Sequence, residues 1–570
     1  MTNTQKNYLS YLDNIIEKMN QLEVQADTQQ QLLQRIKKTE LVVPVVGGFS
    51  AGKSTLINSW LEEEVLSTNI TPETALATEL RYSTDSYIEA VKDDESFDKY
   101  ELNQSEDIKK NASKYQYLRL YLNNEKLKRI EPLVLVDMPG FDSPLELHNT
   151  AIMNYLNKGI YFIVLTSIED GNLTKSTLRE LENMAEFGKD FSFCLSKSNL
   201  RSNSDIISIQ EKIQEQLEDY LEFDKKVIPL YQDTGNELEK ILKDIDPEKL
   251  FEKIFKQELK YNYLEVESSI NTIISTLKTS KEDVTNALTE LQNSIKKIIS
   301  KKEKMIEEAK SKYSDNSVEV IVNGVSRELI TNQESLVQMA LSNKEAFSQE
   351  MNQIVKNTLI YQVKSKLNEA SSDIINDFSV EIKDLGNSIP SFELGNKWVD
   401  TISESTTNFL KNAQNGLSNL VESRRGKQTD DSGTGYKSIT SILAITSEVV
   451  HPVLEVVIVF LPDIIAFFSA KSQEAKMKQE VHTKFSTEII PSIKTKIRNE
   501  LPNLFHSQIN TIINTISDKF EEQLQQKEQE IEKAKEEKEK NIEDIETKLV
   551  KLEEIKQEVK QLAISTLYKD

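Results

Sequence analysis

Gly47-Gly48-Phe49-Ser50-Ala51-Gly52-Lys53-Ser54-Thr55 is the stretch of sequence from which the fold of this chain can be worked out. The apolar run 41–46 precedes it as a predicted buried strand, and residues 55–61 read as the first turns of a helix. A strand, a glycine-rich loop, a Lys-Ser pair and a helix in this order are typical of a phosphate-binding P-loop. The chain has only 15 glycines in 570 residues, so glycines in register with Lys53 and Ser54 argue against a chance match.

The P-loop and a second motif together predict a site for a nucleoside triphosphate with Mg²⁺. Lys53 would contact the β- and γ-phosphates, and the Ser54 hydroxyl would be a Mg²⁺ ligand. A second apolar run, 133–136, ends in Asp137-Met138-Pro139-Gly140. In this position Asp137 would hold Mg²⁺ through a water molecule, and the Gly140 N–H would contact the γ-phosphate.

Residues 41–235 alternate strand-like and helix-like runs, which predicts an α/β domain with a mostly parallel sheet and helices on both faces. The nucleotide is expected at the carboxyl ends of the parallel strands. Strands are expected at 41–46, 117–122, 133–136, 160–165, 191–195 and 227–230, and helices near 145–157, 175–188 and 205–223.

Composition limits the partners and the compartment. A chain of 570 residues forms more than one domain, and the scarcity of Gly and Pro with 29% charged residues favours long helices. The net charge of −23 argues against nucleic acid as a partner. Cys194 is the single cysteine, so no intramolecular disulfide can form, and residues 1–20 lack a signal-peptide pattern. We expect a cytoplasmic protein that associates peripherally with a membrane.

The remaining sequence is predicted to be helical. Residues 1–40 are expected to form one helix that packs on a neck bundle. Heptad-like apolar spacing runs from 270 to 298 and again from 520 to 562, with breaks expected at 314–316 and 386–390. We expect a long antiparallel stalk in which 236–422 is the outward leg and 471–570 the return leg. The alternative is a plain helical bundle without a mechanical role.

Between the two legs lie a polar loop near 423–436 and the most apolar stretch of the chain, 439–470. Pro452 and Pro462 interrupt this stretch, and acidic residues do so too, which argues against a clean transmembrane span. An interfacial hairpin at a membrane-binding tip is one interpretation, and a plug buried within the stalk is the other. The centre of the predicted tip is Val456, Val457, Ile458, Val459, Phe460 and Leu461.

Three motifs together resemble those of the bacterial dynamin-like proteins, which are large GTPases of the dynamin superfamily. These motifs are the P-loop, the stretch Ile70-Thr71-Pro72-Glu73-Thr74-Ala75-Leu76-Ala77-Thr78, and Asp137-Met138-Pro139-Gly140-Phe141-Asp142. The stalk and the apolar tip match this family in layout only. The resemblance implies hydrolysis of GTP to GDP and phosphate with Mg²⁺, self-assembly through G domains or the stalk, and membrane remodelling, in some members with a second dynamin-like protein.

The resemblance also implies roles for individual residues. Lys53 and Ser54 would bind phosphate and Mg²⁺, Ser50 would offset transition-state charge and hold the attacking water, and Thr74 would close over Mg²⁺ as the first switch. Asp137 and Gly140 would form the second switch. No arginine finger can be named, and Arg81 is the nearest arginine after Thr74. The whole loop would contact the nucleotide, through Gly47, Gly48, Phe49, Ser50, Ala51, Gly52, Lys53, Ser54 and Thr55.

The motif that would read the base departs from the family pattern Thr-Lys-x-Asp, because the chain has Ser196-Lys197-Ser198-Asn199. The amide of Asn199 offers one donor where a carboxylate would accept a second hydrogen bond from guanine, and an opposed buried polar group costs about 1–3 kcal/mol. Ser202 stands where family members often carry a second acid. Weak GTP binding, GTP binding only when the protein is dimerised, and relaxed selectivity that admits ATP or XTP are all left open. The alternative functions are a nucleotide-regulated scaffold with little turnover and a P-loop ATPase with a coiled-coil arm.

Overall fold

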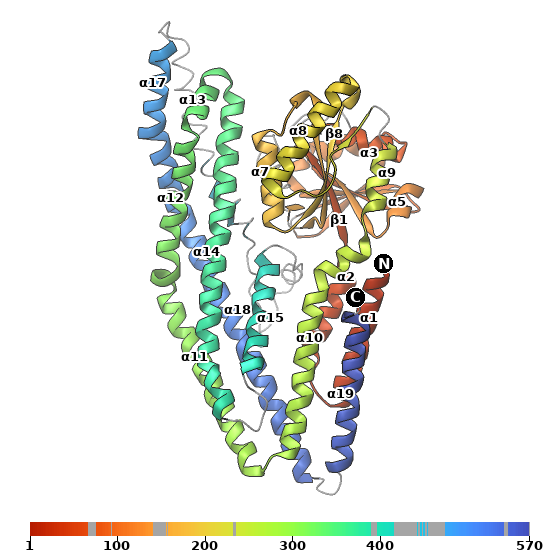
Figure 1. The fold of residues 1–570 in the computed structure, drawn as a ribbon, viewed down its shortest axis with the longest axis vertical. Helices are drawn as coiled ribbons and strands as arrows, with labels where there is room; N and C mark the ends of the chain where they lie inside the picture. The colour runs from red at the N-terminus through yellow and green to blue at the C-terminus, as the bar shows by residue number, and fades with distance from the viewer. Residues whose placement is uncertain are drawn as a thin grey trace.

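The computed structural model describes residues 1–48, 50–66, 76–92, 94–140, 155–156, 158–231, 235–388, 396–414, 442, 445–446, 449–450, 453, 474–540 and 545–568. Within these residues the chain forms one sheet domain and two groups of long helices (Figure 1). We call the group that carries the sheet domain the neck, and the longer group beside it the trunk. Both termini lie where the neck meets the sheet domain (Figure 1).

The sheet has nine strands in the order β4-β3-β5-β2-β6-β1-β7-β8-β9, and β6, β1, β7, β8 and β9 run parallel. All the predicted strands are present, but three further strands, β2, β3 and β4, were not predicted. Charged residues interrupt the apolar pattern in these three, most clearly in β4, which buries no residue. The bounds are β1 (Leu41–Gly47), β2 (Ala77–Tyr82), β3 (Tyr87–Val91), β4 (Phe97–Tyr100), β5 (Tyr117–Leu122), β6 (Leu133–Asp137), β7 (Tyr161–Ser167), β8 (Asp190–Ser196) and β9 (Ile228–Pro229).

Helices cover both faces of the sheet because successive side chains of a strand point to opposite faces. Val43 and Val45 of β1 join the apolar cluster that includes α3 and α9, whereas Val42 and Val46 join the cluster of α7 and α8. The helices predicted near 175–188 and 205–223 are therefore present, and most of the one near 145–157 lies outside the described residues. The helices are α3 (Lys53–Leu61), α4 (Ser105–Lys110), α5 (Glu125–Ile130), α7 (Lys175–Glu186), α8 (Asn203–Leu221) and α9 (Gly235–Asp244).

The neck consists of α1 (Asn3–Gln21), α2 (Asp27–Lys38), α10 (Pro247–Lys278) and α19 (Ile545–Leu567). The prediction of a single helix over residues 1–40 is wrong, because the chain turns between α1 and α2. Leu22 N–H bonds back into the last turn of α1, and Glu23 adopts a left-handed φ of 55°. The apolar side chains of the neck belong to the same buried cluster as one face of the sheet, so the two parts share a core.

The trunk has a separate core. The predicted break at 314–316 is wrong, because a π-helical turn, Lys310–Ser314, joins α11 to α12 within one helical rod. At the second predicted break, α14 ends at Ser388. The trunk helices are α11 (Lys281–Ala309), α12 (Asp315–Thr331), α13 (Gln333–Ser342), α14 (Lys344–Ser388), α15 (Asn396–Gln414), α17 (Glu474–Lys484) and α18 (Ile490–Lys540), and the end of α18 continues into the neck.

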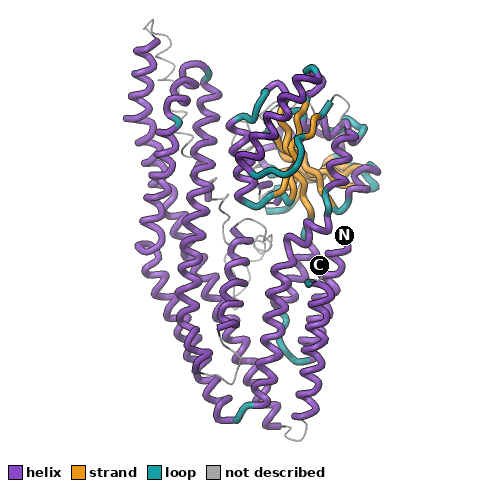
Figure 2. Tube along the Cα trace, viewed as in Figure 1, coloured by secondary structure: helices purple, strands orange, loops and turns teal. Residues whose placement is uncertain are grey.

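The trunk is folded back alongside the neck and the sheet domain. The chain reverses between α10 and α11 at Thr279–Ser280, where the Ser280 hydroxyl caps α11 by accepting the Asp283 N–H. From this turn, α11, α12 and α14 rise to the level of the sheet, and α15 and α18 contact α10 along the way (Figures 1 and 2). The helical legs therefore do not point away from the sheet domain, and α14 contacts α7 on its surface.

The apolar stretch 439–470 is described at only a few positions. Ile442, Ile445, Val449 and Val453 are at most 1% exposed and lie in the trunk core, as the plug interpretation requires for this first part of the stretch. The predicted tip, 456–461, lies outside the described residues. Among the helices that the structure describes, none combines the length and the apolar character needed to cross a bilayer.

Candidate nucleotide-binding site

The predicted P-loop connects β1, a central strand of the sheet, to α3. A side chain at Gly47 would place its Cβ 2.4 Å from the Leu165 carbonyl oxygen of β7, so only glycine allows the two strands to approach here. The loop then turns through left-handed conformations at Ser50 (φ 62°) and Gly52 (φ 87°). These turns bring the backbone N–H groups at the start of α3 to the carboxyl end of β1, where an anion would bind.

Lys53 reaches back over the loop that precedes it. Its Nζ donates to the carbonyl oxygens of Gly47 and Gly48, both at 3.0 Å, and the residue is only 7% exposed. The loop therefore holds a cation at its centre with its position defined by two backbone acceptors. This is the placement that the sequence predicts for a phosphate-binding lysine.

Ser54 and Asp137 meet although 83 residues separate them. The Ser54 Oγ donates to Asp137 Oδ2 at 2.6 Å, because β1 and β6 run in parallel with Val45 paired to Asp137. The other carboxylate oxygen, Oδ1, is buried and has no hydrogen-bond partner among the described residues. Burial raises the pKa of Asp137, whereas the Ser54 hydrogen bond and the Lys53 charge act in the opposite direction.

These residues fit a magnesium ion. Mg²⁺ prefers oxygen ligands and usually keeps several water molecules, and this pair offers a hydroxyl and an unpartnered carboxylate oxygen side by side. Gly140 is buried two residues beyond Met138, and Ser50 is exposed on the loop. The other predicted residues of this part of the site, Phe49 and Thr74, lie outside the described residues.

The substitution Asp137→Asn should separate metal binding from stability. Because burial raises the pKa of Asp137 in the folded protein, the ionised carboxylate lowers the stability of the nucleotide-free protein at pH 7. The Asp137→Asn variant should therefore unfold at the same temperature as the native protein or at a higher one. This gain should shrink as the pH falls toward 3.8, where unfolded aspartate also becomes protonated. When GTP with Mg²⁺ stabilises the protein against heat, the Mg²⁺ concentration that gives half of this stabilisation should be roughly 10- to 100-fold higher for the variant than for the native protein.

Thermal unfolding with and without Mg²⁺·GTP measures both effects. Asp107→Asn is the matched control, since Asp107 is exposed on α4 and its ion pair with Lys110 is long at 3.9 Å and also exposed. An Asp137→Asn variant with an unchanged response to Mg²⁺ would contradict the assignment of Asp137 to the metal.

The predicted base-reading residues lie at the carboxyl end of β8. Lys197 adopts a left-handed φ of 55°, and the fully buried Ser198 donates from its hydroxyl to the Leu195 carbonyl oxygen at 2.8 Å. Asn199 is exposed, which leaves its amide accessible to a base. An ion pair of 3.0 Å between Lys197 Nζ and Glu169 was not predicted, and only the pairing of β7 with β8 brings these residues together.

Ser202 has a structural role at the place of the family's second acid. Its hydroxyl accepts the Asp205 N–H at 3.3 Å and caps the start of α8. Ser is a favoured residue at this helix position because its short side chain reaches the unpaired N–H groups. No carboxylate at 202 therefore compensates for the amide of Asn199.

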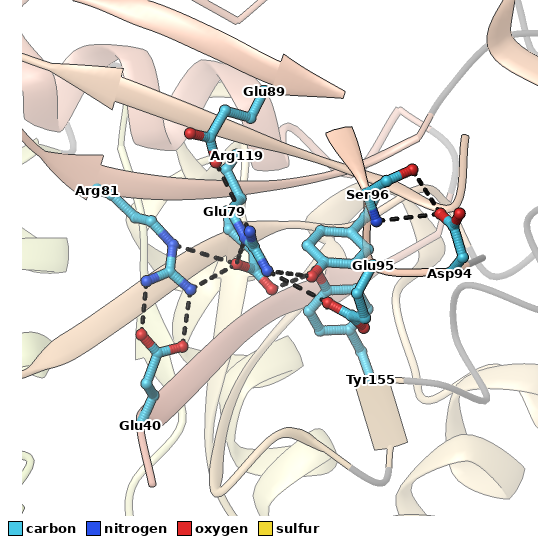
Figure 3. A network of polar contacts seen from close by, with 10 residues as sticks. Glu40, Glu79, Arg81, Glu89, Asp94, Glu95, Ser96, Arg119 and Tyr155 are labelled. Carbon is cyan, nitrogen blue, oxygen red and sulfur yellow. Dashed lines mark hydrogen bonds and ion pairs between the residues drawn. The ribbon is translucent and has the colours of Figure 1, made fainter. Parts of the chain in front are cut away.

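Arg81 is held in a buried network on the sheet, away from the P-loop sequence. Its guanidinium donates to both carboxylate oxygens of Glu40, at 2.6 and 2.8 Å, and to the Oε2 atom of Glu79 at 2.7 Å (Figure 3). These contacts argue against Arg81 as an arginine finger. Glu79 and Arg119 were not predicted as functional residues, and the only sequence signal was the alternation of opposite charges, Glu79 and Arg81, within a short strand.

Comparisons with known proteins show what this chain is similar to. Residues 43–198 match the family model described as the dynamin family. An uncharacterised protein from the xynA 3′ region of Caldicellulosiruptor sp. (strain Rt8B.4) is 28% identical over 183 residues, which are 31% of this chain and 44% of that protein. The match therefore spans less than half the length of that relative.

Two solved structures align with most of the chain. One belongs to an oligomerised bacterial dynamin pair described as sensing and tethering membranes over long range, with 14% identity and a TM-score of 0.34 over 94% of this chain and 91% of that one. The other is LeoA, a bacterial dynamin GTPase from ETEC, with 12% identity and a TM-score of 0.30 over 98% of this chain and 97% of that one.

Proposed function

We propose, on the premise that residues 43–198 form a dynamin-family domain, that this protein binds and hydrolyses GTP and couples nucleotide-driven self-association to the binding or remodelling of a membrane. The observation that carries this proposal is the P-loop geometry, in which Lys53 lies over the loop and Ser54 lies 2.6 Å from Asp137. These groups would hold the phosphates and Mg²⁺, and Lys53 would stabilise the charge that develops on the phosphate oxygens. The metal would supply further charge neutralisation there.

We further propose that the chain divides as the sequence predicts. Residues 41–235 would be the GTPase domain, 1–40 would pack on the neck, and 236–422 and 471–570 would form the two legs of a lever. The membrane would be contacted by 423–470 through the tip residues 456–461. A second copy of the chain, or a second dynamin-like protein, would be the partner in self-association.

The rate of GTP hydrolysis as a function of protein concentration tests this proposal. If two GTPase domains must pair, the rate should rise more than linearly with concentration, and anionic liposomes should raise it further by gathering the protein on a surface. A rate per molecule that stays constant across both series would contradict the self-association part of the proposal.

The contact between α7 and α14 provides a mechanical link from the GTPase domain to the trunk. Lys356 pairs with Glu180, and the two side chains are 2% and 4% exposed, while Arg179 pairs with Glu350 at 2.8 Å. Ile360 of α14 is buried in the apolar cluster of α7 and α8. That cluster also contains Met138, which follows Asp137, so a change at the nucleotide can reach the trunk through packed side chains.

This contact has the character of an interface that can open. It is largely polar, and ion pairs of this kind gain hydration when they separate, which offsets much of the lost attraction. An open groove of about 680 Å³ borders it, so solvent reaches the edge of the contact. The residues that line this groove include Arg179, Asn183, Tyr220, Arg327, Asn357 and Tyr361. We therefore propose that nucleotide binding or hydrolysis separates the trunk from α7.

A nucleotide-regulated scaffold with weak turnover or relaxed base selectivity is the second candidate, because Asn199 replaces the base-reading carboxylate. In this case Asn199→Asp should strengthen GTP binding roughly 10- to 100-fold by restoring two acceptors for guanine. The same substitution should weaken the binding of XTP relative to the binding of GTP. The measurement is a titration of the same sample with GTP, ATP and XTP.

Asn203→Asp is the control for this titration, since it adds the same charge at an exposed position on α8. If Asn199→Asp and Asn203→Asp change GTP affinity equally, Asn199 does not read the base. If the native protein already prefers GTP strongly and turns it over quickly, the scaffold alternative is wrong.

A further inference from the structure

The carboxylate of Glu79 on β2 is the centre of a buried network at 3% exposure. Its Oε2 atom accepts from Arg81 at 2.7 Å and lies 3.8 Å from Arg119, whereas its Oε1 atom accepts the Tyr155 hydroxyl at 2.8 Å (Figure 3). The two oxygens thus have different partners. One side of the carboxylate is fixed to the sheet by arginines, and the other side is available to fix Tyr155.

The two arginines hold the Glu79 carboxylate in place because each arginine also binds at least one other carboxylate. Arg81 is bound by Glu40, and Arg119 lies 3.6 Å from Glu89 and 3.5 Å from Glu95 (Figure 3). A buried carboxylate is costly unless it is paired and hydrogen-bonded, and here two arginines and the Tyr155 hydroxyl surround Glu79. Burial raises the pKa of Tyr155 well above its usual value, so its hydroxyl keeps the proton that it donates.

Tyr155 is also tied to the sheet through its backbone. Its carbonyl oxygen accepts the Gly159 N–H at 2.7 Å, and the next residue, Ile160, donates to the Val42 carbonyl oxygen of β1 at 2.9 Å. A Cβ at Gly159 would lie 2.8 Å from the Tyr155 carbonyl oxygen, so this tight turn needs glycine. The backbone of Tyr155 is therefore fixed to β1 and its side chain to β2.

Glu79 stands next to the predicted metal residue Asp137 in the sheet. In the antiparallel pairing of β2 with β6, Thr78 is opposite Asp137 and Glu79 is opposite Val136. Along the chain, β2 begins three residues after the predicted switch residue Thr74. The hydrogen bond between Tyr155 and Glu79 thus ties Tyr155 to the strand that pairs with β6 at Asp137.

We infer that Glu79 and Tyr155 are positioning residues for GTP hydrolysis, which together fix β2, where Thr78 is opposite Asp137, relative to β1 and to Asp137. They touch neither the nucleotide nor the metal, and they act through the elements to which they are attached. The inference rests on the proposed function, because hydrolysis is the step that this alignment serves. A triphosphate with its attacking water requires tighter alignment than GDP, so the pair should matter for turnover more than for GDP binding.

The test compares Tyr155→Phe with Tyr117→Phe in the full-length protein. Tyr117 is the matched control because its hydroxyl accepts from Arg119 at 2.7 Å in the same network, yet it lies in β5. Tyr155→Phe should lower kcat for GTP about tenfold, as expected for one lost hydrogen bond, and should leave KM and GDP affinity within about twofold. Tyr117→Phe should leave kcat within about twofold, although both variants lose stability.

Three outcomes decide the inference. A merely structural role predicts equal losses of thermal stability in both variants with unchanged kcat, and this result would overturn it. If Tyr155→Phe does not fold, Glu79→Gln serves instead. A neutral amide oxygen accepts the Tyr155 hydroxyl more weakly than a carboxylate does, so kcat should fall several-fold while GDP affinity stays within about twofold, and an unchanged kcat would overturn the inference. If the native protein shows no turnover, the proposed function fails, and the pair is then judged by binding: Tyr155→Phe must reduce the difference in affinity between a non-hydrolysable GTP analogue and GDP.

Discussion

Replacement of Lys53 by alanine should lower the rate of GTP hydrolysis by at least about 100-fold, which is the usual cost of removing one pre-positioned charge donor from a transition state. Lys53 Nζ is held by the carbonyl oxygens of Gly47 and Gly48, so its charge is already in place before the phosphates arrive. No reorganisation is then needed when negative charge develops. The hydrolysis rate at saturating GTP and the affinity for GDP together measure the loss.

The control for this variant is Lys110→Ala, which removes an exposed lysine from α4 near the edge of the sheet. Since Lys53 is nearly buried, its loss also changes local packing, and thermal unfolding of both variants shows whether the fold persists. A folded Lys53→Ala protein that hydrolyses GTP at the native rate would refute the assignment of the P-loop and with it the proposed enzyme.

The second large effect is expected from the ion pair between Lys356 of α14 and Glu180 of α7. Lys356→Glu would place two carboxylates together at a site where the native side chains are 2% and 4% exposed. Breaking a buried pair in this way costs about 3–5 kcal/mol, so the equilibrium should shift by roughly two to four orders of magnitude toward a trunk separated from α7. Small-angle X-ray scattering should record a larger maximum dimension.

The swapped pair Glu180→Lys with Lys356→Glu should restore the compact form, because opposite charges again face each other. Lys366→Glu is the matched control on the same helix, since Lys366 pairs with Glu369 of α14 itself and does not bind α7. If Lys356→Glu lowers the unfolding temperature without any change in scattering, the contact is a permanent part of the fold, and release of the trunk from α7 is not how the protein works.

Much of the sheet domain could be predicted because its central strands are continuous apolar runs. Buried parallel strands bury both faces, so residues 41–46 and 160–165 stand out from a highly charged sequence. The strands β2, β3 and β4 did not stand out, because their charged residues are paired across strands. Glu79 is buried only because Arg81, Arg119 and Tyr155 surround it.

The sequence predicted that the rest of the chain is helical, but it predicted only some of the positions at which the helices begin and end. Three- and four-residue apolar spacing identified helices, but it could not show that residues 1–40 turn at Leu22, since the apolar pattern resumes in α2. Ser314-Asp315-Asn316 resembled a helix end, yet a π-helical turn absorbs these residues and the rod continues. Local composition gives the tendency to form a helix, whereas packing against α14 and α18 determines where it ends.

The sequence by itself determined the strand, turn and helix start of the predicted P-loop, because these are made from consecutive residues whose order dictates them. It also pointed to Asp137 as the partner of Ser54, since an apolar strand that ends in Asp-x-x-Gly delivers its carboxylate to the same edge of a sheet. Only the tertiary structure decided that the trunk folds back onto the sheet domain and that Lys356 meets Glu180, 176 residues away in the sequence. The physical reason is that such contacts depend on the complementarity of two distant surfaces, and no local pattern of charge or apolar spacing specifies which surfaces will meet.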